Sequence, residues 1–326
     1  MPFKPIPHRD LEMFYVLNPD PSAMLSATHD TLPSSQPFKT GLPTLVFIHA
    51  AGANVTSWRS QLSDPRLSQA FNLFAMDCRF HGFTRGGERT EHTLENSAEC
   101  VLATVEEMRF GRFSLYGEGV HGSQIASWIA AKLFSQSSQS SQCASPCPVV
   151  SLCLASPGFP SEPSHITSML RSVQEEALAN KDGKGDGTGR ISEEALEDLA
   201  GYFIGGSERV RGEREGMKRR LQSRYGTGHS SHDLRWLFLA IYSRRPIPQP
   251  LLDLVTCPVL ILRGAEDTIV SPPAAVEAWV ASFPNASTGT GPQTHTIASA
   301  PSLISLSDSN VVNRVLLQFV GRSWAA

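Results

Sequence analysis

The sequence has no long apolar run and no excess of charge of either sign. No stretch approaches the roughly 18 apolar residues of a membrane span, and the first ten residues hold no uninterrupted apolar segment like that of a signal peptide. The 28 basic and 31 acidic residues give a formal charge of -3, too little to gather nucleic acid or an anionic membrane. We therefore predict a cytoplasmic protein that binds a small-molecule substrate or ligand, with no nucleic-acid or membrane partner. The sequence leaves open whether the chain forms a homodimer.

Cysteines are few, and their positions do not indicate a disulfide framework. The six cysteines are scattered in a way more typical of buried, reduced thiols. Cys143 and Cys147 are close enough to suggest half of a zinc site, but no second Cys or His pair follows at the spacing of a zinc finger. We therefore predict no metal site and no cofactor.

Buried strands and helices alternate along most of the chain. Apolar runs predict strands of the kind that lie in a parallel sheet covered on both faces, over 44–48, 72–76, 113–116, 149–155 and 259–263. Helices are predicted over 93–108, 123–134 and 308–320, and the polar stretch 135–142 is predicted to be a surface loop. This alternation predicts an α/β fold with a doubly wound, mostly parallel sheet.

From about residue 157 to residue 250 the strand signals stop. Helical patterns cover 166–179, 192–203, 207–224 and 232–243. We expect an α/β core formed by 1–156 and 251–326, with 157–250 inserted as a helical lid. Ligands of open α/β sheets bind outside the carboxyl ends of the strands, so such a lid would cover the site and influence the choice of substrate.

Four short motifs occur in an order typical of one protein superfamily. They are His49-Ala50-Ala51-Gly52, Asp77 to Thr84, Gly117-Glu118-Gly119-Val120-His121-Gly122 and Gly264-Ala265-Glu266-Asp267. Together they resemble the α/β-hydrolase superfamily, in particular its lid-bearing esterases, lactonases and epoxide hydrolases, from about Pro43 to Val320. The second motif departs from the family pattern, because Phe80 stands where the family has a glycine. The resemblance implies the α/β-hydrolase fold.

The resemblance implies a nucleophile at position 119, in the sharp strand-to-helix turn of the third motif. Gly119 has no side chain to attack a substrate, which excludes acyl-enzyme chemistry at this position. The turn requires a left-handed backbone that glycine adopts without penalty, so glycine relieves on the order of 1–3 kcal/mol of strain. The resemblance also implies an oxyanion hole formed by the backbone N–H groups of Val120 and of Ala50 or Ala51.

Two positions compete for the place of the family's catalytic histidine, opposite the acid Asp267. His295 has the usual separation from Asp267, but residues 287–291 would then form the last strand, and they include no large apolar side chain. In the other register residues 294–298 form the strand and Ser302 takes the place of the histidine. We expect Ser302, with His295 as the alternative.

The remaining ionisable residues near these motifs each have a structural and a chemical interpretation. Asp267 is either an acid or base with a raised pKa or a carboxylate bonded to local backbone. Glu118 is either a hydrogen-bonded group beneath the turn or a catalytic one. For His121, whose pKa the helix dipole should lower, we favour a packed core histidine. His49 and His81 are interpreted as stabilising turns.

We therefore expect an α/β-hydrolase-fold protein with a degenerate catalytic triad. The favoured function is non-hydrolytic catalysis, by cyclisation, elimination or isomerisation of a small carbonyl-type metabolite. Superfamily members that became lyases, cyclases or cofactor-free oxygenases are the precedent for this hypothesis. One alternative is a ligand-binding pseudoenzyme or receptor. The other is an esterase or lactonase inactivated by a Ser-to-Gly substitution at position 119, whether natural or engineered.

Overall fold

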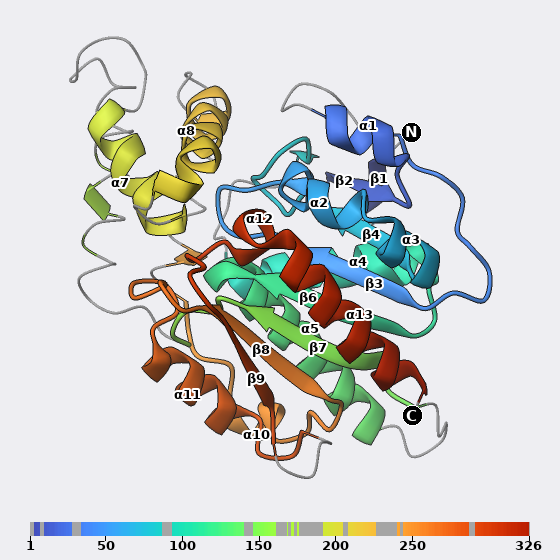
Figure 1. Ribbon diagram of the computed structural model, residues 1–326. Coiled ribbons are helices and arrows are strands. Elements are labelled where there is room, and N and C mark those ends of the chain that lie inside the picture. Colours follow the sequence, from blue (N-terminus) through green and yellow to red (C-terminus); the bar gives the residue numbers. More distant parts are fainter. Residues whose placement is uncertain are drawn as a thin grey trace.

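The computed structural model describes residues 3–6, 10–27, 34–86, 93–139, 146–160, 168, 171–172, 175, 192–204, 208–225, 240–241, 244–286 and 291–325. At the centre of these residues lies a nine-stranded sheet with the order β1-β2-β4-β3-β6-β7-β8-β9, in which β5 pairs with β2 (Figure 1). Its strands are β1 (Phe3–Ile6), β2 (Leu11–Leu17), β3 (Thr44–Ile48), β4 (Asn72–Met76), β5 (Arg85–Gly86), β6 (Phe113–Glu118), β7 (Val149–Ala155), β8 (Val259–Gly264) and β9 (Gln293–Ile297).

The sheet is parallel from β4 to β9 and antiparallel at its other edge. β3 pairs in parallel with β4 and β6, and β7, β8 and β9 continue that order. β1 pairs antiparallel with β2, and β2 pairs antiparallel with β4. The strands predicted from apolar runs are all present, and the mostly parallel sheet confirms the predicted fold class. The hairpin of β1 and β2 was not predicted.

Helices cover both faces of the sheet. One face packs against α4 (Leu94–Met108), α5 (Gly119–Gln139), α10 (Gln249–Leu252) and α11 (Pro273–Ser282), whose apolar side chains form one core cluster. The other face packs against α1 (Pro21–Ser26), the 3-10 turn η1 (Val55–Trp58), α2 (Arg59–Leu62), α3 (Pro65–Ala70), α12 (Ile304–Ser307) and α13 (Ser309–Ala325). No helix in the described part of the chain is long and apolar enough to cross a membrane.

Helix α5 is longer than predicted at both ends. It begins at Gly119 instead of residue 123, and it continues through Gln139 instead of ending at residue 134. The loop predicted over 135–142 is therefore wrong for 135–139, while 140–142 lie outside the described residues. The buried residues of α5, from Gly119 to Leu133, pack in the core and stabilise the helix. Serine and glutamine only weakly disfavour helix, so the helix continues through the exposed residues that follow.

Helical structure is described in the segment between β7 and β8 where a lid is predicted, and its two longest helices within the described residues lie before α10. They are α7 (Glu193–Ile204) and, after the 3-10 turn η2 (Glu208–Val210), α8 (Arg211–Tyr225). Lys218 of α8 pairs with Glu193, Glu197 and Glu215, which ties the two helices together. Their apolar faces share a cluster with Ala50, Val120 and other residues at the carboxyl ends of the strands. The predicted helices 166–179 and 232–243 lie almost entirely outside the described residues, and the division into three segments stays a prediction.

Candidate functional site

The candidate site is built around the strand-to-helix turn at Gly119. Strand β6 ends at Glu118 and α5 begins at Gly119, whose φ is +67°. A Cβ placed on Gly119 would lie 2.9 Å from the Cβ of Ala50, well inside the usual 3.5–4.0 Å or so between carbons in contact. A Cβ on Gly122 would lie 2.2 Å from the carbonyl oxygen of Ile48. Glycines therefore allow α5 to start directly against β3 and the turn that follows it.

A small cavity lies above Gly119 at the carboxyl ends of the strands. Its volume of about 10 Å³ leaves room for about one water molecule. It is lined by Ala50, Ala51, Gly119, Val120, Ser156, Ile241, Val270, Ser302 and Leu303. Val120 is the second residue of α5, so the helix supplies no partner for its backbone N–H. The structure thus brings Ala50, Ala51 and Val120 to one cavity, as an oxyanion hole requires.

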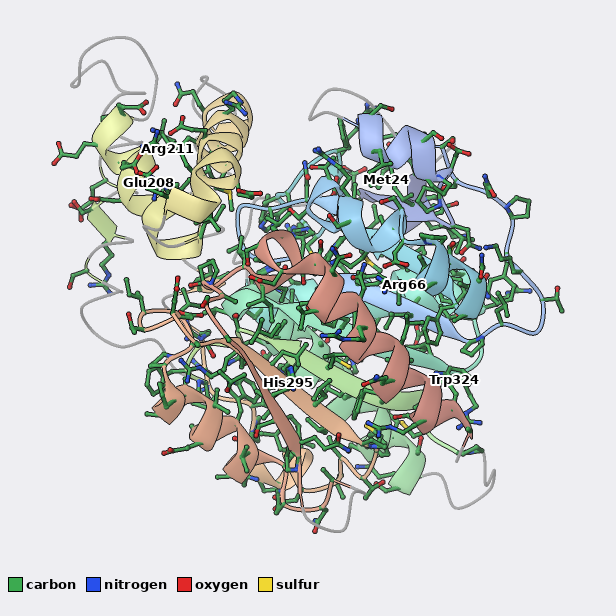
Figure 2. The ribbon with its side chains drawn as sticks, in the orientation of Figure 1. Met24, Arg66, Glu208, Arg211, His295 and Trp324 are labelled. Atoms are coloured by element: carbon green, nitrogen blue, oxygen red, sulfur yellow. The ribbon has the colours of Figure 1, made fainter. Side chains whose placement is uncertain are left out.

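The last strand distinguishes between the two candidate histidine positions. Strand β9 covers Gln293–Ile297 and pairs in parallel with β8, which places His295 opposite Leu262. His295 is exposed on β9 (Figure 2) and lines a surface hollow beside α11. Ser302, in contrast, lines the cavity above Gly119. The strand has the register that brings Ser302 to the cavity and leaves His295 outside it.

Asp267 lies buried in the turn after β8, with 2% of its surface exposed. Its Oδ1 accepts a hydrogen bond from the backbone N–H of Val270 at 2.9 Å, while its Oδ2 has no hydrogen-bond partner among the described residues. Burial raises the pKa of Asp267, and contacts with the Ser271 backbone and the Ser302 hydroxyl offset part of that rise. Ser302 therefore lies close to the carboxylate of Asp267, and Oδ2 of Asp267 could accept a further hydrogen bond.

Glu118 lies beneath the turn and does not line the cavity. Its Oε1 accepts a hydrogen bond from the backbone N–H of Ser305 at 2.8 Å, and the Ser305 hydroxyl is 2.6 Å from the hydroxyl of Tyr116. Burial raises the pKa of Glu118 to about 7, and hydrogen bonds from Ser305 limit the rise. These contacts favour the structural interpretation of Glu118.

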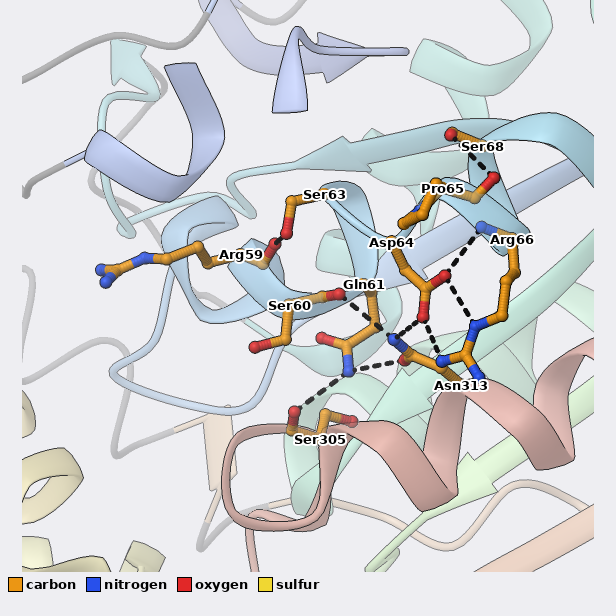
Figure 3. A network of polar contacts seen from close by, with 10 residues as sticks. All are labelled: Arg59, Ser60, Gln61, Ser63, Asp64, Pro65, Arg66, Ser68, Ser305 and Asn313. Carbon is orange, nitrogen blue, oxygen red and sulfur yellow. Dashed lines mark hydrogen bonds and ion pairs between the residues drawn. The ribbon is translucent and has the colours of Figure 1, made fainter. Parts of the chain in front are cut away.

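Ser305 also belongs to a polar network that joins α2, α3, α12 and α13 (Figure 3). The Gln61 amide donates hydrogen bonds to the carbonyl oxygen of Ser305 and to Oδ1 of Asn313, both at 3.0 Å. Asn313 donates to Oδ2 of Asp64 at 2.8 Å, and Asp64 also pairs with Arg66. Burial opposes ionisation of Asp64, but hydrogen bonds from Arg66 and Asn313 outweigh it and lower its pKa to about 2. The lower side of the turn is thus held by a hydrogen-bonded network, in which Oε1 of Gln61 has no partner among the described residues.

His121 packs against His49 and His81, and all three rings are fully buried. The ring centroids of His49 and His81 are 4.6 Å apart, and those of His81 and His121 are 4.8 Å apart. Burial lowers the pKa of His49 to about 3, helped by the nearby His121, and lowers the pKa of His121 to about 4. The pKa of His121 moves in the predicted direction, with burial in place of the helix dipole as its main cause. None of the three lines the cavity.

One residue of the cavity was missed at the level of sequence. Ser156 follows β7, has a φ of +45° and lines the cavity, with its buried hydroxyl lacking a hydrogen-bond partner among the described residues. Its place immediately after a predicted strand was the available signal. Phe80, in the position of a family glycine, has a φ of +65° and lies beneath the guanidinium of Arg79, 4.8 Å from the ring centre. The turn after β4 therefore has a left-handed residue at position 80, although that residue is a phenylalanine.

Comparisons with known proteins agree with this architecture. A family profile described as the alpha/beta hydrolase fold matches residues 43–295, whereas no curated protein sequence matches the chain. An α/β-hydrolase enzyme from a Medee basin deep-sea metagenome library is 13% identical, with a TM-score of 0.70 over 96% of each chain. A thermophilic esterase from Thermogutta terrifontis is 18% identical, with a TM-score of 0.69 over 99% of this chain and 97% of its own.

The enol-lactonase from Burkholderia xenovorans is 12% identical, with a TM-score of 0.69 over 98% of this chain and 100% of its own. Likeness at such low identity shows a shared fold and leaves activity undecided. The family profile covers more than half of the chain and includes the motifs around Ala50, Gly119 and Asp267. The chain belongs to the α/β-hydrolase fold family.

Proposed function

We propose that this protein catalyses a non-hydrolytic proton transfer in a small carbonyl compound, leading to isomerisation, elimination or cyclisation. One observation carries the proposal. Gly119 and Ser302, which the family resemblance assigns to the places of the nucleophile and the histidine, line one cavity with the backbone of Ala50 and Val120, and Ser302 contacts the carboxylate of Asp267. The carboxylate and the backbone groups cannot form an acyl-enzyme, but they are the groups that proton abstraction next to a carbonyl needs.

The proposed reaction divides the work between backbone and side chains. The N–H of Val120 and that of Ala50 or Ala51 bind the carbonyl oxygen and stabilise the negative charge of an enolate. Asp267 accepts the proton, because a raised pKa makes a carboxylate a stronger base. Ser302 lies between this carboxylate and the cavity and passes the proton. The cavity has room for about one water, so substrate enters only when its apolar wall at Ile241 and Leu303 moves.

The proposed substrate class is a ketone, ester or lactone of small size. The cavity lining is apolar except for the hydroxyls of Ser156 and Ser302, which suits a neutral organic molecule. Two of the proteins with similar structures are named as an esterase and an enol-lactonase, and both names denote carbonyl substrates. The predicted lid helices α7 and α8 would then set which carbonyl compounds reach Gly119.

Exchange of hydrogen for deuterium tests this proposal without knowledge of the final product. The protein is incubated in D₂O with a panel of small ketones, keto esters and lactones, and exchange at the carbon next to the carbonyl is followed by NMR. We expect at least one compound to exchange faster than in buffer, and Asp267→Asn to lower that rate by at least about 10²-fold. Glu266→Gln, an exposed neighbour, is the matched control and should leave the rate unchanged.

A second candidate is a protein that binds such a compound without converting it. It is favoured by the absence of any ionisable side chain from the described lining of the cavity. A compound that is retained by the protein but shows no exchange would support this candidate and contradict catalysis. Hydrolysis of esters by the unmodified protein, abolished by Asp267→Asn, would contradict both.

A further inference from the structure

Three histidines from separate segments of the chain meet within the core. His49 follows β3, His81 lies in the turn after β4, and His121 is in the first turn of α5. One potential ligand atom from each lies within 4.8 Å of the other two, and none of the side chains is exposed. A cluster of three imidazoles is a recurring ligand set for zinc and other late first-row metals.

The hydrogen bonds around the rings fix which nitrogen of each ring carries the lone pair. A carbonyl oxygen only accepts, so Nδ1 of His81 donates to the Arg79 carbonyl at 2.9 Å and Nδ1 of His121 donates to the His49 carbonyl at 3.2 Å. Each of these rings therefore carries its lone pair on Nε2. Metal-binding histidines usually have this arrangement, in which the other ring nitrogen donates to a carbonyl. His49 likewise donates from Nδ1 to the carbonyl of Ala50 at 2.8 Å.

The environment of the His121 Nε2 atom indicates a ligand. It is buried and has no hydrogen-bond partner among the described residues, and an unsatisfied buried polar atom costs about 1–3 kcal/mol. His121 lies in the first turn of α5, between Val120 and Gly122, where a small apolar side chain would avoid that cost. The packing of three rings alone leaves the cost unexplained, whereas a metal ion would remove it.

We propose that His49, His81 and His121 bind a divalent transition-metal ion, with Zn²⁺ as the first candidate. Nitrogen ligands disfavour Ca²⁺ and Mg²⁺, which prefer oxygen. Tetrahedral bonds of about 2.1 Å place ligand nitrogens about 3.4 Å apart, so the rings must turn toward one another from separations of up to 4.8 Å. Nε2 of His49 would also give up the hydrogen bond from the Cys78 N–H, now 3.0 Å long.

The proposed ion would link the turns that form the cavity above Gly119. His49 immediately precedes Ala50, and His121 immediately follows Val120, so two ligands flank the backbone of the oxyanion hole. The ion would fix the spacing of these N–H groups from below. This inference does not depend on the proposed reaction, because a ligand-binding protein would gain the same rigidity.

The test uses the full chain without a histidine tag, refolded from denaturant with Zn²⁺, Cu²⁺, Ni²⁺ or Co²⁺, or with a chelator. Refolding is needed because the rings are fully buried. We expect about one ion per chain after gel filtration, measured by mass spectrometry of the metals, and a visible spectrum of nitrogen-bound Co²⁺. The Tm should rise by at least about 5 °C at saturating metal. A protein that retains none of the four metals, with the same Tm in metal and chelator, would overturn the proposal.

Variants distinguish the core cluster from other histidines of the chain. His121→Gln should lose the bound metal and the rise in Tm, while His295→Ala, which removes an exposed histidine on β9, should keep both. Equal retention of metal by His121→Gln and the unmodified protein would place the ion elsewhere and refute the site. If His121→Gln does not fold, the metal content and Tm of the refolded unmodified chain still test whether the protein binds a metal ion.

Discussion

The two sides of the turn at Gly119 differ in how their polar groups are paired. Beneath the turn, Glu118, Ser305 and the network through Gln61 and Asn313 are joined by hydrogen bonds of 2.6–3.0 Å. Above it, Oδ2 of Asp267 and the hydroxyl of Ser156 are buried without a partner among the described residues. Buried polar groups stabilise a fold only when they are paired. The lower network contributes its hydrogen-bonded groups to stability, although Oε1 of Gln61 has no partner among the described residues, and the upper side carries groups that a ligand or substrate would pair.

This difference bears on the proposed function, which assigns Gly119 and Ser302 to the places of a nucleophile and a histidine. Gly119 has a left-handed backbone that glycine adopts without strain, and neither residue belongs to the lower network. The carboxylate of Asp267 is buried, and burial raises its pKa. The lower network that positions the turn therefore does not depend on which side chains stand at positions 119 and 302.

The largest expected effect is a gain of ester hydrolysis when a serine and a histidine are introduced at positions 119 and 302. The double variant Gly119→Ser with Ser302→His should hydrolyse p-nitrophenyl acetate at least about 10³-fold faster than the unmodified protein, measured as kcat/KM. Each single variant should gain far less, because a serine needs its histidine. Adding Ala50→Gly should increase the rate further, since it removes the contact 2.9 Å from the new Cβ.

The outcome of this restoration shows how far the change above the turn extends. A folded triple variant that remains inactive would mean that the walls of the cavity, and not only the two side chains, have lost the capacity for hydrolysis. Activity in Gly119→Ser with His295 present and Ser302 unchanged would contradict the placement of Ser302 at the cavity. Circular dichroism and the Tm of each variant control for folding.

A smaller effect, about 3 kcal/mol, is expected from the charge of Glu118 beneath the turn. Its pKa is about 7 in the folded protein against 4.5 for an ordinary glutamate, so the folded state disfavours the charged form. The free energy of unfolding should therefore fall as the pH rises from about 4.5 to 7, relative to Glu118→Gln, and level off above that range. Urea denaturation across this range measures the difference. If the difference in the free energy of unfolding between the two proteins does not change with pH, burial does not raise the pKa of Glu118.

The next effect concerns the network that joins α2, α3 and α13. Asn313→Ala removes partners from Gln61 and Asp64 and should lower the free energy of unfolding by about 2 kcal/mol. Asn310→Ala, at an exposed position on the same helix, should change it by less than about 0.5 kcal/mol. Urea denaturation of both variants gives the comparison. Equal effects would show that the lower side contributes no more to stability than the surface does.

Features set by local patterns could be predicted from sequence, and those set by distant contacts could not. The strands β3, β4 and β6 to β8 were predicted because a continuous apolar run needs burial on both faces. The hairpin β1–β2 was missed because an edge strand tolerates Lys4 and Pro5. The end of α5 was missed because exposed serines resemble a loop in composition.

The same division holds at the candidate site. Ser302 was placed because residues 287–291 include no large apolar side chain and so do not form the last strand, and Gly119 was placed by its motif; both assignments need only local sequence. The meeting of His49, His81 and His121 depends on which turns the sheet order brings together, and the bonds of Gln61 to Asn313 span 252 positions of the chain. No periodicity in one segment encodes such contacts, so His49 and His81 were interpreted only as turn residues.

The smallest effect tests whether the upper side has closed around glycine. Gly119 and Gly111 have nearly the same left-handed backbone, with φ of +67° and +70°, but a Cβ on Gly111 meets nothing within 4 Å. Gly111→Ala should therefore cost about 1 kcal/mol from backbone strain alone. Gly119→Ala should cost about 1 kcal/mol more, because its Cβ meets that of Ala50 at 2.9 Å. Denaturation of the two variants measures the excess, and Ala50→Gly should remove it. Equal costs would mean that Ala50 and the turn after β3 shift easily to make room for a side chain at position 119. That result is expected if the site differs from a serine hydrolase only at the nucleophile. An excess at Gly119 instead indicates that the residues around it, Ala50 in particular, pack closely against a glycine and leave no room for a side chain at position 119.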